Sequence, residues 1–142
     1  VEDNEDHAEL VIRNLEEQDI DHVIYHVQDG EAALDYLFHR GAFLNEDDAP
    51  RPELILLDLR LPKIDGLSVL KEIKDCEDLK IIPTIILTSS ESDSDISSAY
   101  SNHANSFLVK PMDFQNYTQL MREMGLYWLA CNTSPQVGNL RE

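Results

Sequence analysis

Apolar residues occur in two different patterns along this chain, helical spacing and continuous runs. Between Asp6 and Gln18 they recur at helical spacing, which predicts a first helix ending near Gln18. Three later segments are instead continuous apolar runs, the pattern of strands buried on both faces of a sheet. These runs are Leu54–Leu57, Ile85–Leu87 and Phe107–Val109, and each stops at a polar residue, Asp58, Thr88 and Lys110 respectively.

Further elements complete the alternation of strands and helices. His22–Val27 predicts another strand, and Val1 and Glu2 have the character of the end of a first strand. We therefore expect several apolar residues to precede Val1 in the full protein, and stable folding to require them. Strands that alternate with helices predict a three-layer α/β domain with a parallel sheet. The remaining helices are expected at Glu31–His39, Gly66–Asp75, Asp93–Ser101 and Asp113–Cys131.

Length and composition limit the choices further. The 142 residues predict one domain, covering residues 1–132, followed by a polar tail at 133–142. With 28 acidic and 11 basic residues the net charge is -17, which disfavours direct binding of nucleic acid or of an anionic membrane surface. Cys76 and Cys131 are far apart and outside any metal-binding motif, which is typical of a protein in the reducing cytoplasm.

Five polar residues mark the strand ends: Glu2, Asp3, Asp58, Thr88 and Lys110. Ligands of open parallel sheets bind beyond the carboxyl ends of the strands, so these side chains are expected to meet at one edge. Clustered carboxylates favour a hard cation such as Mg²⁺. An ammonium and a hydroxyl beside them suit an anion with several oxygens. Asp58 is then placed to attack a phosphoryl donor.

Each of these residues also has an ordinary structural explanation. An acidic pair near a chain start is often part of a solvated turn, and an aspartate before a loop often caps that loop. The functional interpretation depends on their joint placement, each at the end of an apolar strand.

The same residues lie in motifs that resemble those of response-regulator receiver domains, over nearly the whole chain. This resemblance implies a flavodoxin-like, five-stranded parallel sheet in the order 2-1-3-4-5, wrapped by five helices. The long connection from Gly41 to Pro52 further resembles stand-alone regulators paired with phytochrome-type kinases. The motifs are Val1-Glu2-Asp3-Asn4, Leu54-Ile55-Leu56-Leu57-Asp58, Leu61-Pro62-Lys63-Ile64-Asp65-Gly66, Leu87-Thr88-Ser89 and Lys110-Pro111.

The resemblance implies a phospho-accepting signalling domain that is not an enzyme acting on other substrates. Asp58 would accept a phosphoryl group from a sensor histidine kinase, and Thr88 and Lys110 would hold its oxygens. Mg²⁺ would be held by Glu2 (through water), Asp3, Asp58 and the main-chain carbonyl of Arg60. Phe107 occupies the aromatic switch position that responds to Thr88.

The last predicted helix carries more apolar residues than one buried stripe needs, which indicates an interface. We expect a homodimer formed through the fourth helix, fifth strand and fifth helix.

Three rival functions are each disfavoured by particular residues. A haloacid-dehalogenase-type phosphatase with Asp58 as nucleophile needs a second Asp two residues on, where Arg60 stands. A flavin- or nucleotide-binding domain needs a phosphate loop where acidic Glu2–Asp6 stands. A pseudo-receiver would lack one of the five functional residues.

Overall fold

The computed structural model describes residues 1–18 and 22–135. Its three strands are β1 (Ile55–Leu57), β2 (Thr84–Thr88) and β3 (Ser106–Val109), paired in parallel in the order β1-β2-β3. They coincide with the three continuous apolar runs. The helices are α1 (Glu5–Glu16), α2 (Gly30–Phe38), α3 (Gly66–Asp75), α4 (Asp93–Ser101) and α5 (Phe114–Gly125), with a π-helical extension at Leu126–Cys131 and 3₁₀ turns at Gly41–Phe43 and Glu46–Asp48.

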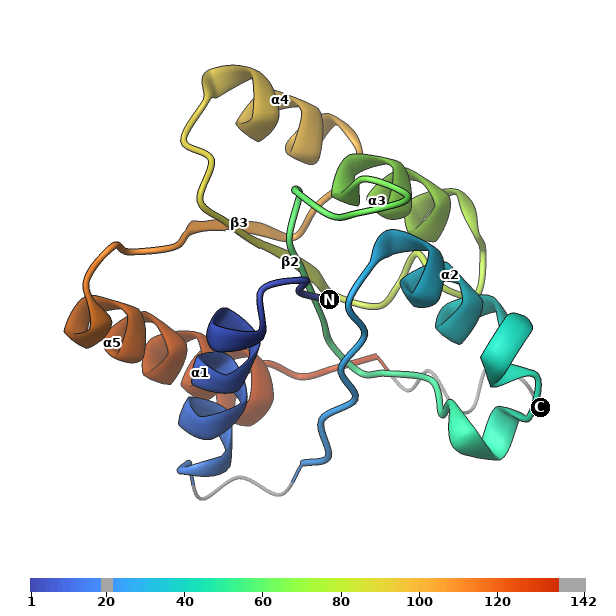
Figure 1. Ribbon diagram of the computed structural model, residues 1–142, viewed down its shortest axis with the longest axis horizontal. Helices are drawn as coiled ribbons and strands as arrows, with labels where there is room; N and C mark the ends of the chain where they lie inside the picture. Colours follow the sequence, from blue (N-terminus) through green and yellow to red (C-terminus); the bar gives the residue numbers. More distant parts are fainter. Residues whose placement is uncertain (19–21, 136–142) are drawn as a thin grey trace.

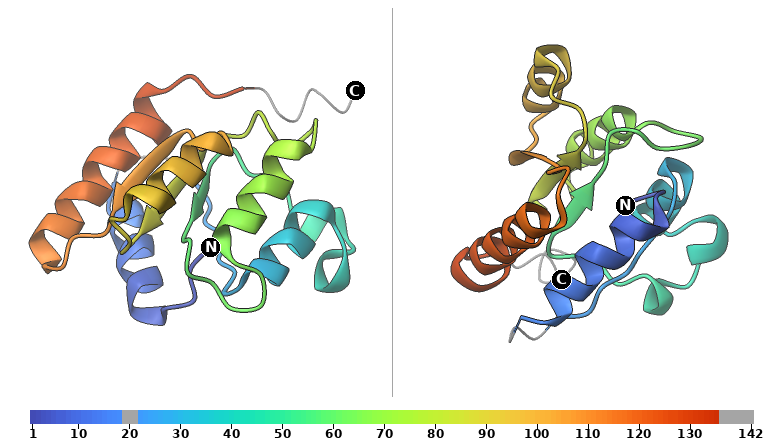
Figure 2. Two further views of the ribbon diagram at one scale, coloured as in Figure 1. Left: turned by 90° about the horizontal axis from the view of Figure 1, so that it is seen from above. Right: turned by 60° about the vertical axis from the view of Figure 1, so that its left-hand side comes forward.

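The helices cover both faces of the sheet, which gives the expected three layers (Figures 1 and 2). On β2, Ile85 and Leu87 pack in one apolar cluster with residues of α1 and α5. Ile86, between them, packs in the other cluster with residues of α2 and α3. Since successive strand residues point to opposite faces, burial of all three explains why the run lacks polar alternation.

The predicted strand at His22–Val27 was wrong, because these residues are extended but form no sheet ladder. The first residues of the chain lie between this segment and β1, as the order 2-1-3-4-5 requires: the Glu2 N–H donates to the Val27 carbonyl at 3.1 Å, and the Asp58 N–H donates to the Val1 carbonyl at 3.2 Å. A cavity of about 440 Å³ lies between α1, residues 22–27 and β1. Hence three of the five expected strands are formed within the described residues, and these three have the predicted order.

Side-chain caps fix where the helices begin. Asn4, Asp29, Asp65, Ser92 and Asp113 each accept a hydrogen bond from a main-chain N–H in the first turn of the following helix. The predicted bounds of α3 and α4 are confirmed, whereas the long last helix changes to π-helical geometry after Gly125.

Two further observations concern the rest of the chain. No helix in the described ranges has the length and apolar character needed to cross a membrane. Of the predicted polar tail, residues 136–142 lie outside the described residues.

Candidate functional site

The five polar residues expected at the sheet edge come together. Asp58 follows β1, Thr88 ends β2, and Lys110 follows β3, while Glu2 and Asp3 lead into α1. The Lys110 N–H donates to the Thr88 carbonyl at 2.8 Å, so the ends of β2 and β3 are held in register. Four of the five residues are buried, and Asp3 is exposed.

Lys110 connects the two buried carboxylates. Its Nζ donates to Asp58 Oδ2 at 2.7 Å and to Glu2 Oε1, and its side chain is only 4% exposed. One ammonium thus compensates two acids in a region where an unpaired charge is costly. The long lysine side chain thus reaches from the end of β3 past β2 to the residue that follows β1.

The two carboxylates titrate in opposite directions. Burial, with Asp58 nearby, raises the pKa of Glu2 to about 7 even though Lys110 opposes the shift. Burial also acts to raise the pKa of Asp58, but the hydrogen bond from Lys110 and the Arg60 N–H outweigh it and lower that pKa. Asp58 is therefore the carboxylate that stays ionised, as a nucleophile must.

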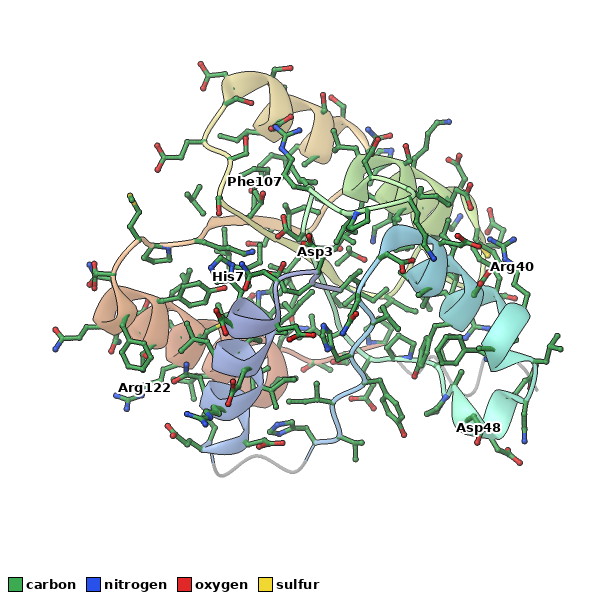
Figure 3. All side chains as sticks on the ribbon, viewed as in Figure 1. Asp3, His7, Arg40, Asp48, Phe107 and Arg122 are labelled. Carbon is green, nitrogen blue, oxygen red and sulfur yellow. The ribbon has the colours of Figure 1, made fainter. Side chains whose placement is uncertain are left out.

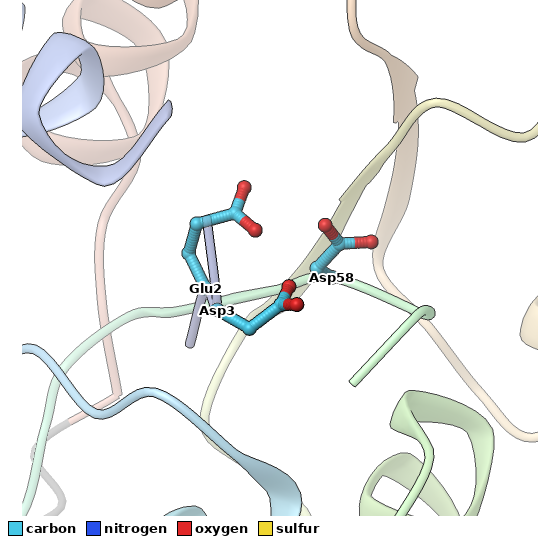
Figure 4. Close-up of side chains that lie close together, drawn as sticks. All are labelled: Glu2, Asp3 and Asp58. Atoms are coloured by element: carbon cyan, nitrogen blue, oxygen red, sulfur yellow. The ribbon is translucent and has the colours of Figure 1, made fainter. Parts of the chain in front are cut away.

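Glu2, Asp3 and Asp58 form a group that suits a cation. One carboxylate oxygen from each lies within 4.8 Å of the others, and Figure 4 shows the three side chains converging. Asp3 is exposed, so this group opens to solvent on one side. Oxygen donors with an open side match the preference of Mg²⁺, which keeps several waters.

Arg60 contacts Asp58 through its main chain, and Thr88 contacts the loop that follows β2. The Arg60 N–H donates to Asp58 Oδ1 at 3.2 Å, and Thr88 Oγ1 accepts from the Ser90 N–H at 3.4 Å. The structure thus places the Arg60 main chain against Asp58, whereas its guanidinium extends away toward α4. Phe107, the residue at the expected switch position, is half-buried on the α4 side of β3 (Figure 3).

Gly66 lets the chain turn closely beneath the site. Its N–H donates to the Leu59 carbonyl at 2.9 Å, and a Cβ at this position would lie 2.1 Å from the Asp58 carbonyl oxygen. A side chain at residue 66 would therefore displace the main chain that carries Asp58. This close approach accounts for the glycine in the motif that follows Asp58.

Two contacts of the site were missed from the sequence. The Nδ1 atom of His7, in the first turns of α1, lies 3.2 Å from Lys110 Nζ. Burial lowers the pKa of His7, and the nearby positive charge of Lys110 lowers it further. Asp95, in the first turn of α4, binds the side chains of Arg60 and Ser90. Figure 3 shows His7 and Asp3 near the centre of the view, while Arg40, Asp48 and Arg122 lie toward the outside. Neither contact follows a periodic or motif signal, because each joins the first turns of a helix to a residue far away in the sequence.

The chain is similar to proteins of one family. Residues 1–122 match the response regulator receiver domain. The chain is 46% identical over 136 residues to the probable methanogenesis regulatory protein FilR2 of Methanothrix harundinacea, covering 95% of this chain and 84% of that protein. It is 39% identical over 135 residues to the response regulator Rcp1 of Synechocystis sp., covering 95% of this chain and 90% of Rcp1.

Two solved structures have the same fold. The Mn²⁺-bound form of Rcp1 superposes with a TM-score of 0.90 at 38% identity, covering 95% of both chains. The phosphorylated cyanobacterial phytochrome response regulator RcpA superposes with a TM-score of 0.90 at 38% identity, covering 96% of this chain and 95% of that one. These likenesses confirm the flavodoxin-like α/β fold and the resemblance to stand-alone regulators associated with phytochromes.

Proposed function

Since the chain belongs to the response regulator receiver domain family, we propose that Asp58 accepts a phosphoryl group from the phosphohistidine of a sensor histidine kinase. The family makes the protein a signalling domain of a two-component system and not a metabolic enzyme. The observation that carries the proposal is the position of Asp58, buried after β1 with Lys110 on one carboxylate oxygen and the Arg60 N–H on the other.

The transfer exchanges one bond to phosphorus for another. An Asp58 carboxylate oxygen forms a bond to phosphorus while the bond from phosphorus to the kinase histidine nitrogen breaks. The electron pair of the broken bond stays on the imidazole nitrogen, which then takes up a proton. Lys110 supports this step because its ammonium offsets the negative charge that gathers around Asp58. Thr88, on the neighbouring strand, supplies a hydroxyl for a phosphoryl oxygen.

We further propose that the cation held beside Asp58 is Mg²⁺. Asp3 and Asp58 would ligate it directly, Glu2 would act through water, and the Arg60 carbonyl would complete the protein's contribution. Such an ion neutralises phosphoryl oxygens and thereby lets an anionic donor approach a site lined by carboxylates. The converging acids of Figure 4 support a divalent cation, and the relative Rcp1 has a Mn²⁺-bound form.

The partner in this proposal is a sensor histidine kinase of the phytochrome type, acting in the cytoplasm. The support is the similarity to RcpA, a cyanobacterial phytochrome response regulator. FilR2, which is also similar to this chain, is named for the regulation of methanogenesis. Similarity at this level therefore does not by itself identify the kinase as a phytochrome. Phosphotransfer from a purified phytochrome-type kinase, compared with kinases of other sensor classes, distinguishes these partners.

For output we propose a homodimer formed through α4, β3 and α5, the elements that correspond to the expected interface. Exposed apolar side chains support it: Tyr100 on α4, and Phe114, Leu126 and Tyr127 along α5 and its π-helical extension. Light scattering should show a dimer that weakens in Phe114→Ser. Leu44→Ser, an equally exposed apolar position outside these elements, is the control. A monomer at high concentration, with and without beryllofluoride, would exclude this interface.

Incubation with acetyl phosphate and Mg²⁺ tests the acceptor role without requiring the kinase. The intact mass should rise by one phosphoryl group in the native protein and stay unchanged in Asp58→Asn. Asp65→Asn, at the exposed N-cap of α3, is the matched control and should still be phosphorylated. Labelling that persists in Asp58→Asn would contradict the proposal.

The phosphatase alternative gains no support from the structure. The position where such an enzyme needs its general acid is occupied by Arg60, and the guanidinium of that residue pairs with Asp95. A guanidinium holds its protons too tightly to donate one to a leaving group, so Arg60 does not replace the missing general acid.

A further inference from the structure

His7 contacts the lysine of the acceptor site from the first turn of α1. Its Nδ1 lies 3.2 Å from Lys110 Nζ, and the Lys110 side chain is only 4% exposed. The same ammonium also donates to Asp58 and to Glu2. An ammonium has three N–H donors, so these three acceptors use all of them. The direction of the N–H that meets Asp58 is thus fixed by the other two contacts.

The His7 ring accepts in this contact, because an ammonium donates hydrogen bonds and accepts none. The lone pair is therefore on Nδ1, and the ring proton is on Nε2. A neutral acceptor differs from the two carboxylates that also bind Lys110. It holds the ammonium without adding a further negative charge, which would repel an anionic phosphoryl donor.

The loop before α1 places His7 beside the lysine. The Asn4 side-chain oxygen caps α1 and accepts from the His7 N–H at 3.1 Å. The Asn4 N–H in turn donates to Glu2 Oε2 at 3.4 Å. The His7 ring also lies near the Tyr117 ring of α5, with ring centroids 6.0 Å apart. The imidazole thus has two separable features, an acceptor atom facing Lys110 and a ring beside α5.

We propose that His7 is a positioning residue whose Nδ1 orients the Lys110 ammonium toward Asp58 and thereby speeds phosphoryl uptake. This inference rests on the proposed acceptor role of Asp58. The exchange of bonds at phosphorus is unchanged, since His7 acts on it only through Lys110. An ammonium free to rotate would have to be ordered during the transfer, whereas one held by three acceptors is already in place.

Two kinds of substitution separate the acceptor atom from the ring. His7→Asn keeps an oxygen near the position of Nδ1 but loses the ring, whereas His7→Phe keeps a ring and loses the acceptor. His7→Leu also loses the acceptor, with a smaller apolar side chain. Time courses of intact mass with acetyl phosphate and Mg²⁺ should show uptake slowed roughly three- to tenfold in His7→Phe and His7→Leu. Uptake by His7→Asn should stay within about twofold of the native rate, because the amide oxygen accepts from the ammonium.

The Lys110→Met background tests whether His7 acts through the lysine. There His7→Phe should cause no further slowing, because the ammonium that His7 orients is absent. Uptake at the native rate in both His7→Phe and His7→Leu would overturn the inference. Equal slowing in His7→Asn, or equal slowing by His7→Phe with and without Lys110, would also overturn it. Absence of any uptake by the native protein would instead overturn the acceptor role of Asp58, so the two failures are distinct.

Discussion

Lys110 Nζ lies 2.7 Å from Asp58 Oδ2, so the residue that follows β3 directly neutralises the residue that follows β1. The same ammonium binds Glu2, and its side chain is almost fully buried. The charge on Lys110 is therefore built into the site before any phosphoryl group arrives.

Replacing Lys110 with methionine should slow phosphoryl uptake from acetyl phosphate by about 100-fold, because the transfer loses a preorganised positive charge. Lys71→Met is the matched control, since Lys71 is an exposed residue of α3 whose partner is Asp75. Time courses of intact mass at fixed Mg²⁺ measure both variants. Uptake at the native rate in Lys110→Met would show that the ammonium is only structural.

Loss of the exposed carboxylate at Asp3 should weaken divalent-cation binding by roughly 10-fold or more, because one oxygen ligand is lost. Water-proton relaxation with Mn²⁺ measures this affinity in Asp3→Asn, and Asp6→Asn in the first turn of α1 controls for local charge. Chelation of metal with EDTA should also stop phosphoryl uptake by the native protein. Equal Mn²⁺ affinity in the two variants would remove Asp3 from the metal site.

The Thr88 hydroxyl should be needed for the response to phosphorylation more than for phosphorylation itself. Thr88→Val keeps the buried shape but loses the oxygen, and Thr88→Ser keeps the oxygen. On phosphorylation, amide hydrogen exchange should change in α4 and around Phe107 in the native protein and in Thr88→Ser, but not in Thr88→Val. The same exchange response in all three proteins would exclude Thr88 as the switch.

A methyl group at Gly66 should destabilise the domain, because it would lie 2.1 Å from the Asp58 carbonyl oxygen. We expect Gly66→Ala to lower the free energy of unfolding by about 2 kcal/mol, the usual cost of forcing extra volume into packed structure. At Gly125 the added Cβ meets only the end of the flexible Gln18 side chain. Gly125→Ala should therefore change the unfolding free energy by less than about 1 kcal/mol. Urea unfolding that shows equal effects would contradict this account of Gly66.

The sequence was sufficient to predict the elements that are buried from both sides. The continuous apolar runs at β1, β2 and β3 indicate strands that are buried on both faces of a sheet. The polar residue at the end of each run is therefore expected at the edge of that sheet. The segment His22–Val27 has the composition of a strand, but a strand also requires a hydrogen-bonding partner along its length. Among residues 1–18 and 22–135, the main-chain bond found for this segment is the one from the Glu2 N–H to the Val27 carbonyl, which composition does not reveal.

The site was predictable where it depends on sheet topology and was not predictable where loops meet. Parallel strands bring Asp58, Thr88 and Lys110 to one edge regardless of loop detail. The ion pair between Arg60 and Asp95 depends on how two loops and the start of α4 are oriented. Similarly, His7 reaches Lys110 only because α1 begins beside the sheet edge.

The most direct test of the account is chemical identification of the phosphorylated residue. An acyl phosphate on an aspartate is reduced by borohydride to homoserine, so the modified residue can be located by peptide sequencing in a mass spectrometer. After treatment with Mg²⁺ and acetyl phosphate, the native protein should yield homoserine at position 58 and at no other aspartate. Homoserine at another position, or none when the intact mass has risen, would contradict the assignment of Asp58 as the phosphoryl acceptor.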